Sequence, residues 1–95
     1  MNGLFGLNVD EARKLAVWQR GRAIPNYDPA DWRYDDHGKV IRYRDYGDRQ
    51  AEFGWEIDHI NPSTLGGSDD LSNLRPLHCK VNAGLGGILA GMLNR

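Results

Sequence analysis

Apolar residues follow two different spacings along this chain. They recur at helical spacing near the start, and further on they alternate with polar residues as in β-strands. Over residues 8–20 apolar side chains recur at helical spacing, and Asn8 or Asp10 can cap the start of a helix. Residues 32–46 contain two strand-like runs around a polar turn with a glycine, which predicts a β-hairpin. The stretch 22–31 between them holds two prolines and is expected to be an ordered loop.

A second set of elements is expected from residue 54 onward, again from the spacing of apolar residues. In order, these are a strand, a loop rich in Gly, Ser and Asp, a short strand and a helix. Their ranges are 54–60, 61–72, 74–77 and 78 to about 92. The pattern predicts the α+β fold class in one domain over residues 1–95, with a core motif at about 53–92 and an N-terminal extension, a helix and a hairpin, over 8–46.

Composition limits the kinds of protein that this chain can be. Its 95 residues are 40% hydrophobic, enough for one small core but not for two. A single cysteine excludes an internal disulfide framework and a cysteine-based zinc ribbon. The formal net charge is −1, so any contact with nucleic acid must come from a local basic surface.

The sequence also carries an expectation about location. The N-terminus lacks a basic region followed by an apolar run, and no stretch approaches a membrane-spanning length. We therefore expect a cytoplasmic protein without a signal peptide and without a membrane partner, with a delivered toxin domain as the alternative. The apolar segment 85–93 is either a homodimer interface or packs on the domain's own core.

Polar residues capable of chemistry gather in one segment, which runs FGWEIDHINPSTLGGSDDLSNLRPLHCKVN from Phe53 to Asn82. An Asp-His pair ends the first expected strand, and a double-glycine loop follows. Asn-Leu-Arg-Pro-Leu then starts at Asn73, and a second Asn comes nine residues later. In this combination and order, the segment resembles the HNH endonuclease family, whose fold is the ββα-metal motif. The resemblance extends more weakly upstream, to cover residues 32–82.

The resemblance implies a metal-dependent nuclease of bacterial or phage origin, and the residue types agree with that chemistry. His59 is the expected general base, because a neutral imidazole is available to take a proton near neutral pH. Asn73 matches the middle Asn of the family, which holds the loop through backbone hydrogen bonds and helps to orient the base. Asp58 and His59 are neighbours in a strand and point to opposite sides of it, so a local distortion is expected to bring both to one site.

The expected cofactor is one divalent metal ion, Mg²⁺ or Mn²⁺, with Zn²⁺ as another occupant. Asp58 offers a carboxylate oxygen and Asn82 an amide oxygen, and two protein ligands plus waters suit Mg²⁺. His78 lies four residues before Asn82, so on a helix both would share a face and His78 would suit a third ligand. Glu56 lies two residues before Asp58 on the same strand face and is expected to support a ligand or a basic side chain.

The remaining polar residues have a functional and a structural interpretation. Candidates for phosphate contacts are Arg75, Lys80, Arg42 and Arg44. The last two are expected on one strand face, where the alternative is a solvated surface. Asp69 and Asp70 are expected to serve the loop and cap a turn, since carboxylates there would repel a nucleic-acid backbone. The three tryptophans are expected to pack in the core or against loops rather than to serve as base-stacking platforms.

The function expected from these residues is metal-dependent hydrolysis of phosphodiester bonds in DNA. The chain departs from the family after Asn82, where many relatives have basic residues and this one continues Ala-Gly-Leu-Gly-Gly. The alternative is therefore a catalytically weak module with the HNH fold that binds nucleic acid or has a structural role. DNA is the expected partner, joined by an inhibitor or immunity protein if the domain is a toxin.

Overall fold

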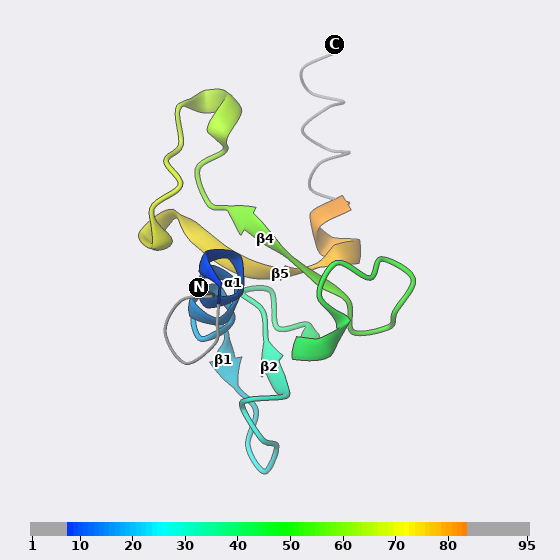
Figure 1. Ribbon diagram of the computed structural model, residues 1–95. Helices are drawn as coiled ribbons and strands as arrows, with labels where there is room; N and C mark the ends of the chain where they lie inside the picture. Colours follow the sequence, from blue (N-terminus) through cyan, green and yellow to red (C-terminus); the bar gives the residue numbers. More distant parts are fainter. Residues whose placement is uncertain (1–7, 84–95) are drawn as a thin grey trace.

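Helix α1 (Val9–Trp18) opens the computed structural model, which describes residues 8–83 (Figure 1). Asn8 caps the helix, since its side chain accepts a hydrogen bond of 2.7 Å from the backbone N–H of Glu11. Two acidic residues in the first turn, Asp10 and Glu11, suit the positive end of the helix dipole. The expected helix is confirmed, and it ends two residues earlier than predicted.

A small antiparallel sheet follows, with the order β1-β2-β3. The strands are β1 (Arg22–Ala23), β2 (Trp32–Tyr34) and β3 (Val40–Arg42). The predicted hairpin is confirmed as β2 and β3. The stretch 22–31 was expected to be only a loop, but Arg22 and Ala23 pair with β2 and form the short third strand β1.

Strands β4 (Trp55–His59) and β5 (Leu74–His78) form a separate antiparallel pair. Their register runs without a break from Trp55 opposite His78 to His59 opposite Leu74. The connecting loop contains two 3-10 turns, η3 (Ser63–Leu65) and η4 (Leu71–Asn73). Helical residues 79–83 follow β5 directly. The α+β class is therefore confirmed, with helices and hairpins in an order compatible with an HNH domain.

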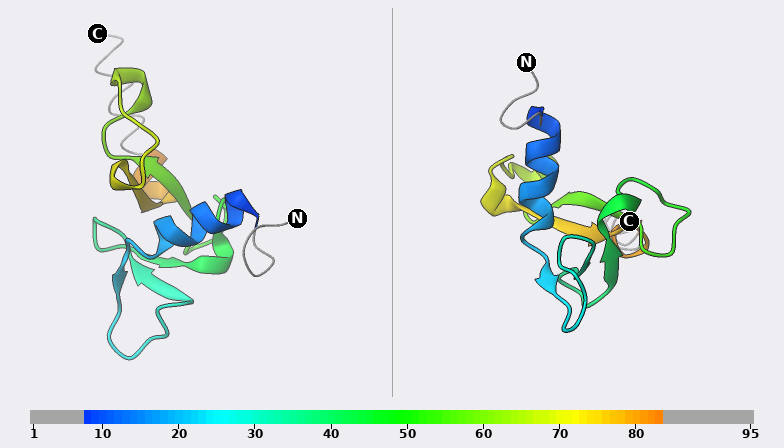
Figure 2. Two further views of the ribbon diagram at one scale, coloured as in Figure 1. Left: turned by 60° about the vertical axis from the view of Figure 1, so that its left-hand side comes forward. Right: turned by 60° about the horizontal axis from the view of Figure 1, so that its bottom comes forward.

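The core joins the N-terminal helix to both sheets. It contains Val17 and Trp18 from α1, Ile41 from β3, Trp55 from β4 and Leu74 from β5. Figure 2 shows α1 crossing the β4–β5 pair, where it packs on β5. Each of the two buried indoles also donates its N–H to a backbone carbonyl, so neither buries an unpaired polar group.

Asp35 connects the β2–β3 hairpin to the end of β5. Its side chain is 1% exposed. One carboxylate oxygen accepts from the backbone N–H groups of His37 and Lys39 at 2.9 and 2.8 Å, and the other from that of His78 at 2.9 Å. A buried carboxylate with three backbone donors is fully paired, and it holds the turn of the hairpin against the junction of β5 with the following helix.

Two sequence-based expectations concern residues beyond the described range. The helix expected to reach about Met92 is seen only as far as residue 83, and the apolar segment 85–93 lies outside the described residues. Over residues 8–83, helices are too short or too polar to cross a membrane.

Candidate active site

The loop between β4 and β5 is held in place by Asn73. Its amide oxygen accepts from the backbone N–H of Asn61 at 2.8 Å, and its amide nitrogen donates to the carbonyls of Asn61 at 3.0 Å and Ser68 at 2.6 Å. These bonds close the loop on both sides of its double glycine. Gly67 is required there, because a Cβ on it would meet the carbonyl oxygen of Asn61 at 1.7 Å. Asn73 thus shapes the segment that follows His59.

Asp58 lies in the middle of a charged group on the β4–β5 pair. Arg75 faces it across the strands and donates from Nε to Oδ2 at 2.9 Å, and Nη1 of the same guanidinium bonds to Asp36 at 3.4 Å. The side chains of Arg75 and Asp58 are each 20% exposed, so this is a half-buried ion pair. The other oxygen of Asp58, Oδ1, makes no hydrogen bond to residues 8–83.

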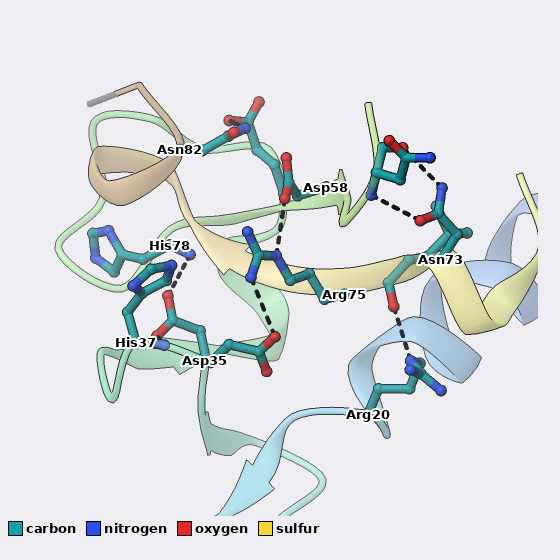
Figure 3. Close-up of polar contacts among 12 residues, drawn as sticks. Arg20, Asp35, His37, Asp58, Asn73, Arg75, His78 and Asn82 are labelled. Carbon is teal, nitrogen blue, oxygen red and sulfur yellow. Dashed lines mark hydrogen bonds and ion pairs between the residues drawn. The ribbon is translucent and has the colours of Figure 1, made fainter. Parts of the chain in front are cut away.

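Asn82 reaches the same face of β4 from the helical residues. Its amide nitrogen donates to Oε1 of Glu56 at 3.3 Å, and the other oxygen of Glu56 accepts from Arg49 at 3.0 and 3.2 Å. A carboxylate can only accept, so it orients the amide with the nitrogen toward Glu56 and the oxygen away from it. Figure 3 shows Asn82 and Asp58 on the same side of the β4–β5 pair. Glu56 therefore holds the amide of Asn82.

The donor chemistry of this face fits a hard divalent cation. Asp58 and Asn82 each present a side-chain oxygen without a hydrogen bond to the described residues, and carboxylate and amide oxygens suit Mg²⁺ and Mn²⁺. Among residues 8–83 there is no group of three or more His, Cys, Asp or Glu side chains that could hold a metal. The fit therefore depends on a small ligand set of one carboxylate, one amide and water, as is usual for Mg²⁺.

His59 has different partners from Asp58. Its Nε2 lies 2.6 Å from Oδ1 of Asp69, and a guanidinium nitrogen of Arg13 from α1 lies 4.0 Å from the same oxygen. The hydrogen bond from His59 lowers the pKa of the Asp69 carboxyl below its ordinary value of 3.8, and Arg13 lowers it further. The strand continues regularly through Asp58 and His59, so the expected local distortion is not seen at these two residues.

His78 does not share a helix face with Asn82, because it is the last residue of β5 and the helical residues begin at 79. Its side chain is engaged on both sides. Nε2 lies 2.7 Å from the carbonyl of Glu52, and Nδ1 accepts from the backbone N–H of Lys80 at 3.1 Å. A carbonyl only accepts, so Nε2 carries the proton. His78 thus caps the start of the helical residues from a buried position.

The candidate phosphate-binding residues are scattered. Arg42 and Arg44 do not lie on one strand face as expected, because β3 ends at Arg42 and the 3-10 turn η2 (Tyr43–Asp45) follows. The guanidinium of Arg42 stacks on Trp32, with 4.6 Å between its carbon and the ring centroid. Lys80 and Arg44 are exposed. Among the four candidates, Arg75 has the direct link to the site, through Asp58.

Three residues near the site were missed by the sequence-based expectations. Asp69 was expected to serve the loop, Arg13 lay in the first expected helix, and Asp35 lay in the expected hairpin. Their partners lie 10, 56 and 43 positions away in the sequence, at His59, Asp69 and His78. Asp69 carried a weak signal, as a carboxylate in a glycine-rich loop directly between the two strands. Arg13 carried no such signal, and Asp35 lay only in the weaker upstream part of the resemblance.

The burial of the remaining candidates agrees with structural roles. Trp18 and Trp55 are 1% and 0% exposed, which confirms their expected place in the core. Burial also raises the pKa of the Cys79 thiol to about 11, with Glu56 contributing. The thiol is therefore protonated near neutral pH and acts as a packing group.

Comparison with known protein families matches residues 47–82 to the family described as HNH endonuclease. This confirms the resemblance to that family over the matched segment, which is less than half of the chain. The segment includes the loop closed by Asn73 and both Asp58 and Asn82, and it excludes α1 and the three-stranded sheet. The match links the segment to a nuclease or nucleic-acid-related function. No curated protein and no solved structure matches the chain.

Proposed function

We propose, from the HNH endonuclease match over residues 47–82, that this chain is a divalent-metal-dependent endonuclease that hydrolyses phosphodiester bonds in DNA. Two side-chain oxygens carry the proposal: one on Asp58 and one on Asn82 make no hydrogen bond to the described residues, and both side chains lie on one side of the β4–β5 pair. Asp58 is also the sequence neighbour of His59. In this proposal the chain folds as the ββα-metal motif, in which β4, β5 and the helix that starts at residue 79 carry the site.

Asp58 and Asn82 are the proposed ligands of one Mg²⁺ or Mn²⁺ ion, with Zn²⁺ as another occupant. A bound divalent ion supplies charge stabilisation to the transition state as a Lewis acid. Glu56 holds the amide nitrogen of Asn82 at 3.3 Å, and this leaves the amide oxygen for the ion. His78 is left out of the ligand set, because both of its ring nitrogens bond to the backbone.

His59 is the proposed general base. Its imidazole takes a proton from the attacking water, and Asn73 keeps the following loop in the shape that presents it. His59 and Asp58 point to opposite sides of β4, so the proposal places the substrate phosphate at the strand end, where it can reach both side chains.

Arg75 is the proposed contact to the scissile phosphate. Its guanidinium uses two of its N–H donors on Asp58 and Asp36, and it has five in all. The remaining donors are available for a phosphate oxygen, in the charge-assisted geometry that arginine favours. Lys80, Arg42 and Arg44 are the proposed contacts to neighbouring phosphates.

The proposed setting is a bacterial or phage cytoplasm, with DNA as the partner, and a homodimer if both strands are cut. An inhibitor or immunity protein belongs to the proposal if the domain is the toxic part of a larger system. The catalytically weak alternative, a module that binds nucleic acid without cutting it, is not better supported by these observations.

Plasmid nicking tests the proposed function. Wild type with Mg²⁺ or Mn²⁺ is expected to convert supercoiled plasmid to the nicked form, and EDTA to abolish the reaction. His59→Ala is expected to lower the rate by about 100-fold or more, as loss of a general base does. The matched control is His37→Ala, which removes an exposed histidine from the β2–β3 turn and is expected to leave the rate unchanged.

Two results would overturn the proposal. One is a folded wild type that binds DNA but does not cut it with any divalent metal, which would favour the non-catalytic alternative. The other is equal cutting by wild type and His59→Ala, which would remove His59 from the reaction.

A further inference from the structure

The contact between His59 and Asp69 lies outside the chemistry assigned so far. Nε2 of His59 and Oδ1 of Asp69 are 2.6 Å apart, a short hydrogen bond of the kind that an ionised carboxylate accepts. Asp69 comes from the double-glycine loop, which Asn73 closes through the carbonyl of Ser68, the residue before Asp69. The carboxylate is therefore presented by a held loop, although its side chain is 77% exposed.

The chemistry of the two groups decides where the proton lies. The carboxylate of Asp69 is ionised near neutral pH, and its pKa is lowered by this hydrogen bond. An ionised carboxylate can only accept, so Nε2 of His59 must carry the proton that it donates. In a neutral imidazole the other nitrogen, Nδ1, is then the unprotonated one, and no residue of 8–83 hydrogen-bonds to it.

We propose that Asp69 is the positioning residue of the base: it holds the ring of His59 with the proton on Nε2 and leaves Nδ1 as the atom that takes the proton from water. This inference rests on the proposed function of His59. When Nδ1 accepts the proton, the imidazolium keeps its Nε2–H bond to the carboxylate, which stabilises the positive charge without taking the proton. An aspartate beside a histidine base has this role in serine proteases.

Arg13 gives the pair a link to the N-terminal helix. It lies on α1, outside the family match, and its guanidinium is 4.0 Å from Oδ1 of Asp69. At this distance between two exposed side chains it contributes weakly, and it places a positive charge from α1 beside the loop.

Nitrogen-15 NMR of the histidine rings tests the inference without any need for cleavage. At alkaline pH, where an ordinary imidazole is neutral, wild type is expected to show His59 with a protonated Nε2 and an unprotonated Nδ1. Asp69→Asn is expected to show a mixture of both tautomers, because an amide can donate or accept. The matched control is Asp70→Asn, since the neighbouring carboxylate contacts Ser68 and not His59. That variant is expected to keep the wild-type ring signals.

Cleavage kinetics supply the second readout. Asp69→Asn is expected to lower kcat by about 10- to 100-fold with KM changed less than about twofold, the usual cost of losing a residue that orients a functional histidine. Asp69→Glu, which restores a carboxylate, is expected to recover part of kcat. Asp70→Asn is expected to cut at the wild-type rate.

The outcomes separate this inference from the proposed function. Wild-type His59 with its proton on Nδ1, or an Asp69→Asn variant that cuts as fast as wild type, would overturn the positioning role. Faster cutting by Asp69→Asn would mean that the carboxylate obstructs the substrate phosphate instead. If wild type shows the expected tautomer but cuts no DNA, the tautomer assignment stands and the proposed nuclease function fails.

Discussion

At the scale of single residues, neighbours in the sequence have separate tasks in the site. Asp58 pairs with Arg75 and keeps one oxygen uncommitted, whereas His59 bonds to Asp69 in the loop. The alternation of a β-strand directs their side chains to opposite sides of β4, so the proposed metal ligand and the proposed base have different partners. In the proposed site, Asn82 is the second metal ligand, and Glu56 holds its amide nitrogen.

The separate tasks predict separate effects on metal binding. Asp58→Ala and Asn82→Ala are each expected to weaken Mn²⁺ binding by about tenfold or more in calorimetric titrations, because each removes an oxygen ligand. His59→Ala is expected to bind Mn²⁺ as wild type does. The matched control is Asp36→Ala, which removes the other carboxylate on Arg75 and should leave the affinity unchanged. Equal loss in Asp58→Ala and His59→Ala would mean that the two roles are wrongly assigned.

At the scale of elements, the junction of β5 with the helical residues is fixed by contacts from two other segments. Asp35 of the hairpin bonds to the backbone of His78, and the ring of His78 bonds to the backbone at Glu52 and Lys80. The start of the helical residues that carry Asn82 is therefore held by hydrogen bonds of two buried residues, Asp35 and His78. A change at Asp35 is expected to disturb the junction although it touches no ligand.

Asp35→Ala is expected to lower the free energy of unfolding by about 3 kcal/mol, because three backbone N–H groups lose their acceptor and two lie in a turn that water can reach. Urea unfolding followed by fluorescence measures this loss. Asp36→Ala is the control, since Asp36 is exposed and makes one long ion pair, and its expected cost is below about 1 kcal/mol. Similar costs for the two variants would show that the Asp35 bonds are not stabilising.

At the scale of the whole molecule, the extension and the HNH segment form one core. Trp18 of α1 packs against Trp55 of β4 with their ring centroids 5.1 Å apart, and both are buried. Arg20, just after α1, also donates to the carbonyl of Leu74 at 2.8 Å. The core of the matched segment 47–82 therefore includes Val17 and Trp18 of α1, which precede the segment in the sequence.

Trp18→Ala is expected to cost about 3 to 5 kcal/mol, the usual loss for a buried aromatic residue. A domain of this size has only about 5 to 15 kcal/mol in total, so the variant is expected to be partly unfolded at room temperature. Near-ultraviolet circular dichroism and urea unfolding measure the effect. Tyr27→Ala is the control at an exposed aromatic residue. A cooperative transition at the wild-type urea midpoint in Trp18→Ala would contradict a shared core.

The sequence by itself determined the features that depend on near neighbours. Helix α1 follows from local spacing and the Asn8 cap, and the alternation around Asp58 determined strand β4. The order of the motif residues from Asp58 to Asn82 was sufficient to predict the match to the HNH endonuclease family over residues 47–82. Only the tertiary structure decided the pairing of Asp69 with His59, of Asp58 with Arg75 and of Asp35 with His78. Each pair depends on strand register or loop closure, which bring together groups 10 to 43 residues apart and leave no periodic pattern in the sequence.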